Sequence, residues 1–103
     1  MIESIFDIRA SDGSRRFAEL PQTLLWDAVR DHIAKLDGAN LTGFHCDGIT
    51  EAWIDFEYRN HQFTINDQFG QYWFFVDDPT CPEPVLQEVF RHFWALLVRI
   101  PLE

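Results

Sequence analysis

The segment from Glu51 to Asp67 constrains the fold of this chain more than any other. Every even position from Ala52 to Tyr58 is apolar, which is the two-residue period of a β-strand with one buried face. A two-residue turn at 59–60 would create these cross-strand pairs: Tyr58–His61, Phe56–Phe63, Ile54–Ile65, Glu57–Gln62, Asp55–Thr64 and Trp53–Asn66. The first three pairs share an apolar face, and the last three share a largely polar one. A slip of one residue would mix the two faces, so we expect this register.

The strand that follows the hairpin, Gln71–Val76, is apolar at every position after the first. A three-residue loop over 68–70 would place Trp73 and Phe75 on the core face. A four-residue loop over 67–70 would instead place the alternate residues there, namely Tyr72, Phe74 and Val76. In both cases the strand has two apolar faces, so its second face must be covered or must remain as an exposed aromatic patch.

Three further strands are expected, over 2–8, 15–20 and 41–46. Asp12–Gly13 is a turn sequence between the first two, because glycine tolerates a positive φ. Asp47–Gly48 joins the third strand to the hairpin. A two-residue turn at this point would place Phe44 on the face of Trp53, whereas a longer loop would place it with Ile54.

Two apolar stripes at helical spacing predict two helices. The first stripe covers 25–36, with Pro21 in the opening turn and Gly38 as the stop. The second covers 86–100, and its expected cap is Thr80 or Cys81. A length of 103 residues leaves room for one domain. We therefore predict a single α+β domain over 1–103, with the order ββαββββα, in which an antiparallel β-meander of four to six strands packs against two helices.

The negative charge of the chain is concentrated in its middle. Residues 42–88 carry nine acidic side chains and one basic one, Arg59, for a net charge of −8 within a total of −9. Nucleic acids and anionic lipid surfaces both bind through cationic protein surface, so neither is an expected partner. A basic protein is the kind of partner that such a field attracts.

The sequence contains no spacing typical of a metal site, a phosphate-binding loop or a nucleophile elbow. We therefore expect neither a cofactor, a metal nor an enzymatic activity. Cys46 and Cys81 are read as buried reduced thiols, and a disulfide between them is the less favoured alternative. The amino-terminal residues lack a basic segment followed by a long apolar run, so a cytoplasmic protein is expected.

Candidate binding residues lie on the polar face of the hairpin and just beyond its last strand. The side chains of Asp55 and Glu57 are expected to project from the same face of the strand as that of Trp53. This set could receive a cationic side chain through charge pairing and a cation–π contact. The predicted partner-binding residues are Trp53, Asp55, Glu57, Trp73, Asp77 and Asp78.

Size, charge and fold class together favour a small acidic protein-binding module, such as an inhibitor or an immunity-type protein that blocks a bacterial toxin. Its carboxylates would pair with Arg and Lys on a basic partner surface, and an exposed ring would anchor the centre. One alternative is a ligand-binding or enzymatic domain with an aromatic pocket around His61 or His45. Another is a homodimer formed through whichever aromatic face the helices leave uncovered.

Overall fold

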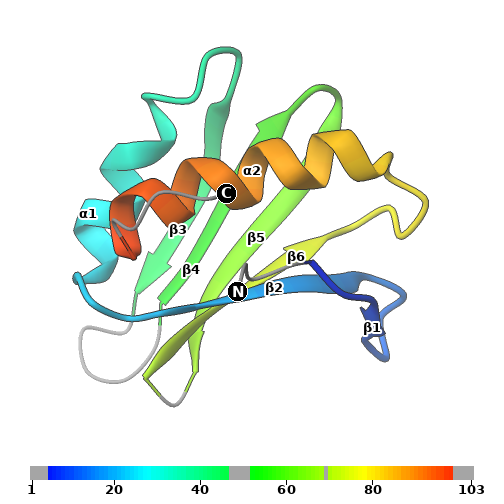
Figure 1. Cartoon of the computed structure of the whole chain (residues 1–103), viewed down its shortest axis with the longest axis horizontal. Helices are drawn as coiled ribbons and strands as arrows, with labels where there is room; N and C mark the ends of the chain where they lie inside the picture. The colour runs from blue at the N-terminus through cyan, green and yellow to red at the C-terminus, as the bar shows by residue number, and fades with distance from the viewer. Residues whose placement is uncertain (1–4, 47–51, 69, 99–103) are drawn as a thin grey trace.

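The computed structural model describes residues 5–46, 52–68 and 70–98. Its elements in chain order are β1 (Ile8–Arg9), β2 (Arg15–Pro21), α1 (Trp26–Ile33), β3 (Asn40–Cys46), β4 (Ala52–Tyr58), β5 (His61–Gln68), β6 (Gln71–Val76) and α2 (Glu83–Leu97). The strands form one six-stranded sheet in which all neighbours are antiparallel. Both helices lie on the same face of this sheet (Figure 1). The predicted α+β class and the order ββαββββα are confirmed.

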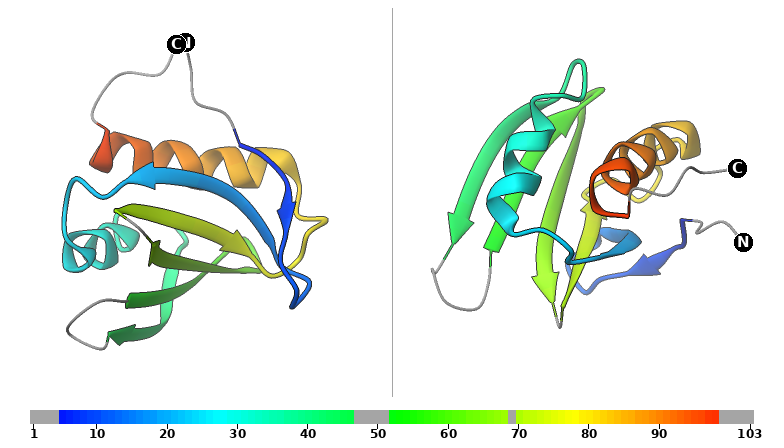
Figure 2. Two further views of the ribbon diagram at one scale, coloured as in Figure 1. Left: turned by 90° about the horizontal axis from the view of Figure 1, so that it is seen from below. Right: turned by 60° about the vertical axis from the view of Figure 1, so that its left-hand side comes forward.

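The strand order is β1-β2-β6-β5-β4-β3. Strands β3 to β6 follow one another as a meander, and the first hairpin of the chain, β1–β2, adds to the far side of β6. Helix α1 therefore connects β2 to the opposite edge of the sheet, and it packs on β3 and β4 while α2 packs on β2 (Figure 2). As a result, the two helices together cover the helix-side face, and the other face carries no helix in the described chain.

The predicted register of the β4–β5 hairpin is confirmed at every pair from Tyr58–His61 to Trp53–Asn66. Arg59 and Asn60 form the turn with φ values of 50° and 66°. Two consecutive positive φ angles are what a tight hairpin turn requires, because they match the right-handed twist of the strands.

The residues of β6 that face the core are the ones that the four-residue loop predicted. Gln68 pairs with Gln71, so the strands pair closer to the turn than either predicted loop would allow. Tyr72, Phe74 and Val76 point into the core, and the intervening positions 73 and 75 face the other way. The Tyr72 hydroxyl donates to the carbonyl of Leu24 at 2.7 Å, which satisfies the only polar group that this buried side chain brings into the core.

Phe44 pairs with Ile54 and so lies on the helix-side face, as the longer-loop alternative predicted. Its ring packs 5.4 Å from the ring of Trp26 in α1. The predicted turn at 47–48 lies outside the described residues. An irregularity in the pairing between Leu41 and Gly43 gives this edge strand a bulge, a feature that discourages further strand pairing at a sheet edge.

Several predicted boundaries are wrong. Pro21 ends β2 instead of opening α1, and of the strand predicted over 2–8 only Ile8 lies in a strand, β1, while residues 2–4 lie outside the described residues. Neither Thr80 nor Cys81 caps α2, since Pro82 occupies the N-cap position. Thr80 instead donates its N–H and its hydroxyl to the carboxylate of Asp78, at 2.9 and 2.6 Å. Local side chain–backbone bonding of this kind competes with helix capping for the same residues.

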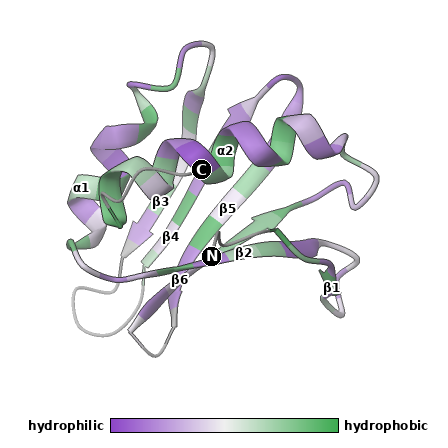
Figure 3. Ribbon diagram, in the orientation of Figure 1, coloured by the Kyte–Doolittle hydropathy of each residue, from purple (hydrophilic) through white to green (hydrophobic). Residues whose placement is uncertain are grey.

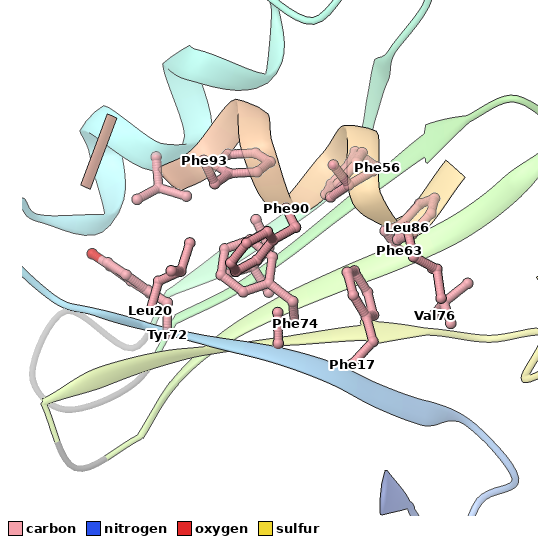
Figure 4. Close-up of a cluster of buried hydrophobic side chains, with 14 of the residues drawn as sticks. Phe17, Leu20, Phe56, Phe63, Tyr72, Phe74, Val76, Leu86, Phe90 and Phe93 are labelled. Atoms are coloured by element: carbon pink, nitrogen blue, oxygen red, sulfur yellow. The ribbon is translucent and has the colours of Figure 1, made fainter. Parts of the chain in front are cut away.

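The core between the sheet and the helices is dominated by aromatic rings (Figure 4). Phe56 and Phe63 stack at 5.1 Å, and Phe93 from α2 lies within 6 Å of both Phe56 and Phe74. Strand β4 alternates between hydrophobic and hydrophilic residues, as Figure 3 shows. Cys81 is buried beside this core as a free thiol, and burial raises its pKa to about 11.

Candidate functional site on the outer face of the sheet

We call the face of the sheet opposite α1 and α2 the outer face. The strand pairings place its side chains in two rows that cross the strands. The tryptophan row consists of His45, Trp53, Asn66, Trp73 and Glu19. The Asp55 row consists of Gly43, Asp55, Thr64, Phe75 and Arg16. The two rows therefore bring aromatic rings, two carboxylates and one guanidinium onto a single surface.

The structure brings most of the predicted binding residues onto this face. The side chains of Trp53, Asp55 and Glu57 project from β4 on this face, and that of Trp73 projects from β6. Asp77 continues the alternation of β6, and its N–H donates to the carbonyl of Gln62 at 3.0 Å.

Asp78 is placed differently from the other predicted residues. Its carboxylate binds Thr80 and lies 4.0 Å from Nδ1 of His61 at the end of the sheet. The Thr80 hydrogen bonds hold the pKa of Asp78 below its ordinary value. We therefore assign Asp78 to the turn before α2.

Asp55 is held in a fixed position on β4. Thr64 donates its hydroxyl to Oδ1 of Asp55 at 2.7 Å. On the neighbouring strand, a Cβ added at Gly43 would lie 3.1 Å from Oδ2 of the same carboxylate. The absence of a side chain at position 43 therefore leaves the space that the Asp55 carboxylate occupies.

The ring of Trp73 is covered by the side chain of Arg16. The guanidinium carbon of Arg16 lies 3.9 Å from the centroid of the Trp73 ring and 5.8 Å from that of Phe6. The Nε atom of Arg16 is buried and has no hydrogen-bond partner among the described residues, so the contacts that the structure gives this guanidinium are with the two rings. Sequence reasoning missed Arg16, because the pairing of β2 with β6 shifts between Arg16 and Ala18 and breaks the alternation of that strand.

Trp53 is the most exposed large ring of the outer face, at 37%. The ring of His45 lies 6.2 Å away, centroid to centroid. Beside Trp53 the surface is hollowed into a shallow depression of about 300 Å³, which we call the Trp53 depression. Its lining comprises Ala10, Ser11, Asp12, Ser14, Trp53, Thr64, Asn66 and Phe75. The turn between β1 and β2 thus reaches the same part of the outer face as β4, β5 and β6.

Asp12 contributes the carboxylate of the depression. Its Oδ1 accepts the N–H of Ser14 at 2.9 Å and the hydroxyl of Ser14 at 2.7 Å. These hydrogen bonds hold the pKa of Asp12 below its ordinary value, so the group is an anion at neutral pH. Neither bond uses Oδ2, which remains available as an acceptor.

Among residues 5–46, 52–68 and 70–98, no group of three His, Cys, Asp or Glu side chains is placed to hold a metal ion. Within the same ranges, neither helix has the length and apolarity needed to cross a membrane. Comparison of the chain with protein-family models, with curated proteins and with solved structures gave no match.

Proposed function

We propose that this protein binds a basic protein partner through the outer face of its sheet. The observation that carries the proposal is the combination of the exposed Trp53 ring, the partly exposed Phe75 ring and several carboxylates on a face that no helix of the described chain covers. Trp53 lies two residues from Asp55 on β4, Phe75 lies two strands away from Asp55 in the same row, and Glu57 and Asp77 extend the acidic character toward one end. Protein interfaces commonly combine an aromatic centre with a charged rim of this kind.

The composition of the face favours a protein over a small ligand as the partner. The Trp53 depression is open, and it accounts for only part of the outer face. Small-molecule sites usually enclose most of their ligand within an apolar cavity. An extended surface that carries several rings and carboxylates is better suited to several side chains of one partner.

The charge of the face favours a basic partner over a second copy of the chain. Arg16 is the one cation in the two rows, whereas Asp55 and Glu19 lie in the same rows and Glu57 and Asp77 lie next to them. A face-to-face homodimer would bring two such acidic surfaces together, and close like charges oppose association. A partner that carries Arg and Lys would reverse the sign of this interaction. Occlusion of a basic functional surface, as in an inhibitor or an immunity-type protein, is the corresponding mechanism.

The test compares charge reversals on two sides of the molecule. Asp55→Lys with Glu57→Lys reverses the outer face. Asp31→Lys with Asp37→Lys changes the net charge equally on α1 and on the loop that follows it. Proteins retained by the unaltered chain from its native cell are identified and purified, and each affinity is measured as a function of salt concentration.

We expect the outer-face variant to lose at least about a hundredfold in affinity, since each of two reversed charges contributes a tenfold or larger change. The variant with Asp31 and Asp37 replaced should retain binding, and the affinity of the unaltered chain should fall as salt rises. Equal losses in both variants, or binding that is independent of salt, would contradict the proposal. A concentration-dependent dimer that Trp53→Leu dissociates would identify a second copy as the occupant instead.

A further inference from the structure

We infer that the Trp53 depression is a receptor for an arginine side chain of the partner. This inference rests on the proposed function, and it names the one partner group that the outer face is shaped to receive. The depression combines the rings of Trp53 and Phe75 with the Asp12 carboxylate and the Thr64 hydroxyl. Aromatic walls with an acceptor at the rim are the elements that recognise a guanidinium.

The outer face already contains one guanidinium bound in this way. Trp53 and Trp73 both pair with Asn66, one on each side of it in the tryptophan row. The Trp73 ring is covered by the guanidinium of Arg16 at 3.9 Å. Among the described residues, Trp53 has the ring of His45 as its neighbour and no cation above it. The two tryptophans therefore hold equivalent positions, and only Trp73 has its cation supplied by the chain itself.

The polar groups around the depression are acceptors with remaining capacity. Asp12 uses Oδ1 for both of its bonds to Ser14, so Oδ2 can accept from a partner. Thr64 donates its hydrogen to Asp55, so the hydroxyl oxygen presents its lone pairs outward. The Asp55 carboxylate lies next to Thr64 on the neighbouring strand. It adds negative charge near the Trp53 depression, although it does not line it. A cationic donor meets acceptors on more than one side.

Arginine fits this environment better than lysine does. A guanidinium is planar, so it can lie flat against the rings of Trp53 or Phe75 while its edge donates to Asp12. It is also more weakly hydrated than an ammonium group, and it loses less when it leaves water for an aromatic surface. The Arg16–Trp73 contact supports the same preference, since this guanidinium lies 3.9 Å from the ring centroid while its buried Nε has no hydrogen-bond partner in the part of the chain that the structure describes.

The experiment uses three capped tripeptides as probes of the whole chain: acetyl-Gly-Arg-Gly-amide, its lysine analogue and its citrulline analogue. Citrulline keeps the planar shape of arginine and removes the charge. The indole N–H signals of the ¹⁵N-labelled protein report binding, and the signal missing in Trp53→Phe identifies that of Trp53. We expect a saturable shift of the Trp53 signal and an affinity for the arginine peptide about tenfold above that for the citrulline peptide. The signal of Trp26, which packs under the helix side, should not move.

Three variants make the inference falsifiable, and in the two that lack the Trp53 indole the binding is followed by the backbone amide signals of the same labelled protein. Trp53→Leu should abolish the difference between the arginine and citrulline peptides, and Trp53→Phe should retain part of it. Asp12→Asn keeps an oxygen for Ser14 and should weaken only the charged peptides. The assignment is overturned if no saturable shift occurs, if the citrulline peptide binds equally, or if the lysine peptide binds as well as the arginine one.

The two proposals fail separately. Loss of partner binding on reversal of Asp55 and Glu57, without selective recognition of the arginine peptide, would leave the proposed function standing and remove the arginine receptor. Selective recognition of the peptide by Trp53, without any effect of the charge reversal on partner binding, would leave the arginine receptor standing and remove the proposed function.

Discussion

The rings of His32 in α1 and His92 in α2 stack with their centroids 3.9 Å apart, and each binds the backbone of the other. Nε2 of His32 lies 2.9 Å from the carbonyl oxygen of His92, and Nε2 of His92 lies 2.7 Å from the carbonyl oxygen of His32. A carbonyl oxygen only accepts, so both rings must carry their hydrogen on Nε2. The pair therefore joins the two helices by reciprocal hydrogen bonds, and any further proton must be taken up at Nδ1.

His92 should make the stability of the protein depend on pH below neutrality. Burial lowers the pKa of His92 below the ordinary value of 6.5; the hydrogen bond to the His32 carbonyl opposes this shift in part, and the charges of His32 and Lys35 add to it. The unfolded chain thus binds a proton at a higher pH than the folded chain does. The stabilisation is fully present above about pH 6.5 and is lost as the pH falls toward the pKa of the folded state.

The variant His92→Gln tests this, because the glutamine amide can replace the Nε2 donor and does not titrate. We expect the urea midpoint of the unaltered chain to fall more between pH 7 and pH 5 than that of the variant. His45 and His61 are present in both proteins and cancel in the comparison, whereas any change at His32 belongs to the stacked pair that the variant removes. An equal fall in both proteins would show that His92 does not contribute to the pH dependence.

Arg15 is a second polar group whose removal should be costly. Its side chain is 8% exposed, and it donates through Nε and Nη2 to the carbonyl of Phe6 and through Nη1 to Glu83 at the start of α2. Arg15→Met would leave the Phe6 carbonyl without its donors, and we expect a loss of about 2–3 kcal/mol in the free energy of unfolding. Urea denaturation measures this loss.

Arg9→Met is the matched control for Arg15. Arg9 binds Asp7 at 2.7 Å, but both side chains are largely exposed. Exposed ion pairs contribute little because water solvates both partners, so the control should unfold at nearly the same urea concentration as the unaltered chain. A loss in Arg9→Met as large as that in Arg15→Met would mean that charge, and not the buried hydrogen bonding, is responsible.

The parts of the fold that follow from local pattern could be predicted from the sequence. The β4–β5 register depends on alternation and on a two-residue turn, and both are visible within residues 52–66. The face of β6 could not be derived in the same way, because both of its faces are apolar. It is decided by long-range partners, such as Leu24, whose carbonyl receives the Tyr72 hydroxyl.

The candidate site could likewise be predicted only where it depends on local sequence pattern. The positions of Trp53, Asp55 and Glu57 follow from the alternation of one strand. The Arg16–Trp73 contact depends on pairing between β2 and β6, which lie far apart in sequence, and on an irregularity in that pairing. The approach of Asp12 to Trp53 depends on the path of a turn across the sheet. Neither has a signature in a single sequence, because the contacts join segments that come together only in the folded chain.

Gly43 should influence the outer face through Asp55. An alanine Cβ at position 43 would lie 3.1 Å from Oδ2 of Asp55, so the carboxylate must shift by a few tenths of an ångström and strain its 2.7 Å bond from Thr64. Thr64→Val removes the donor of the same bond. We expect each variant to lower the free energy of unfolding by about 0.5–1.5 kcal/mol. Because both act on one contact, the double variant should lose less than the two single losses together, as measured by a double-mutant cycle in urea. Additive losses would show that alanine at position 43 destabilises the sheet without acting through the Asp55–Thr64 hydrogen bond.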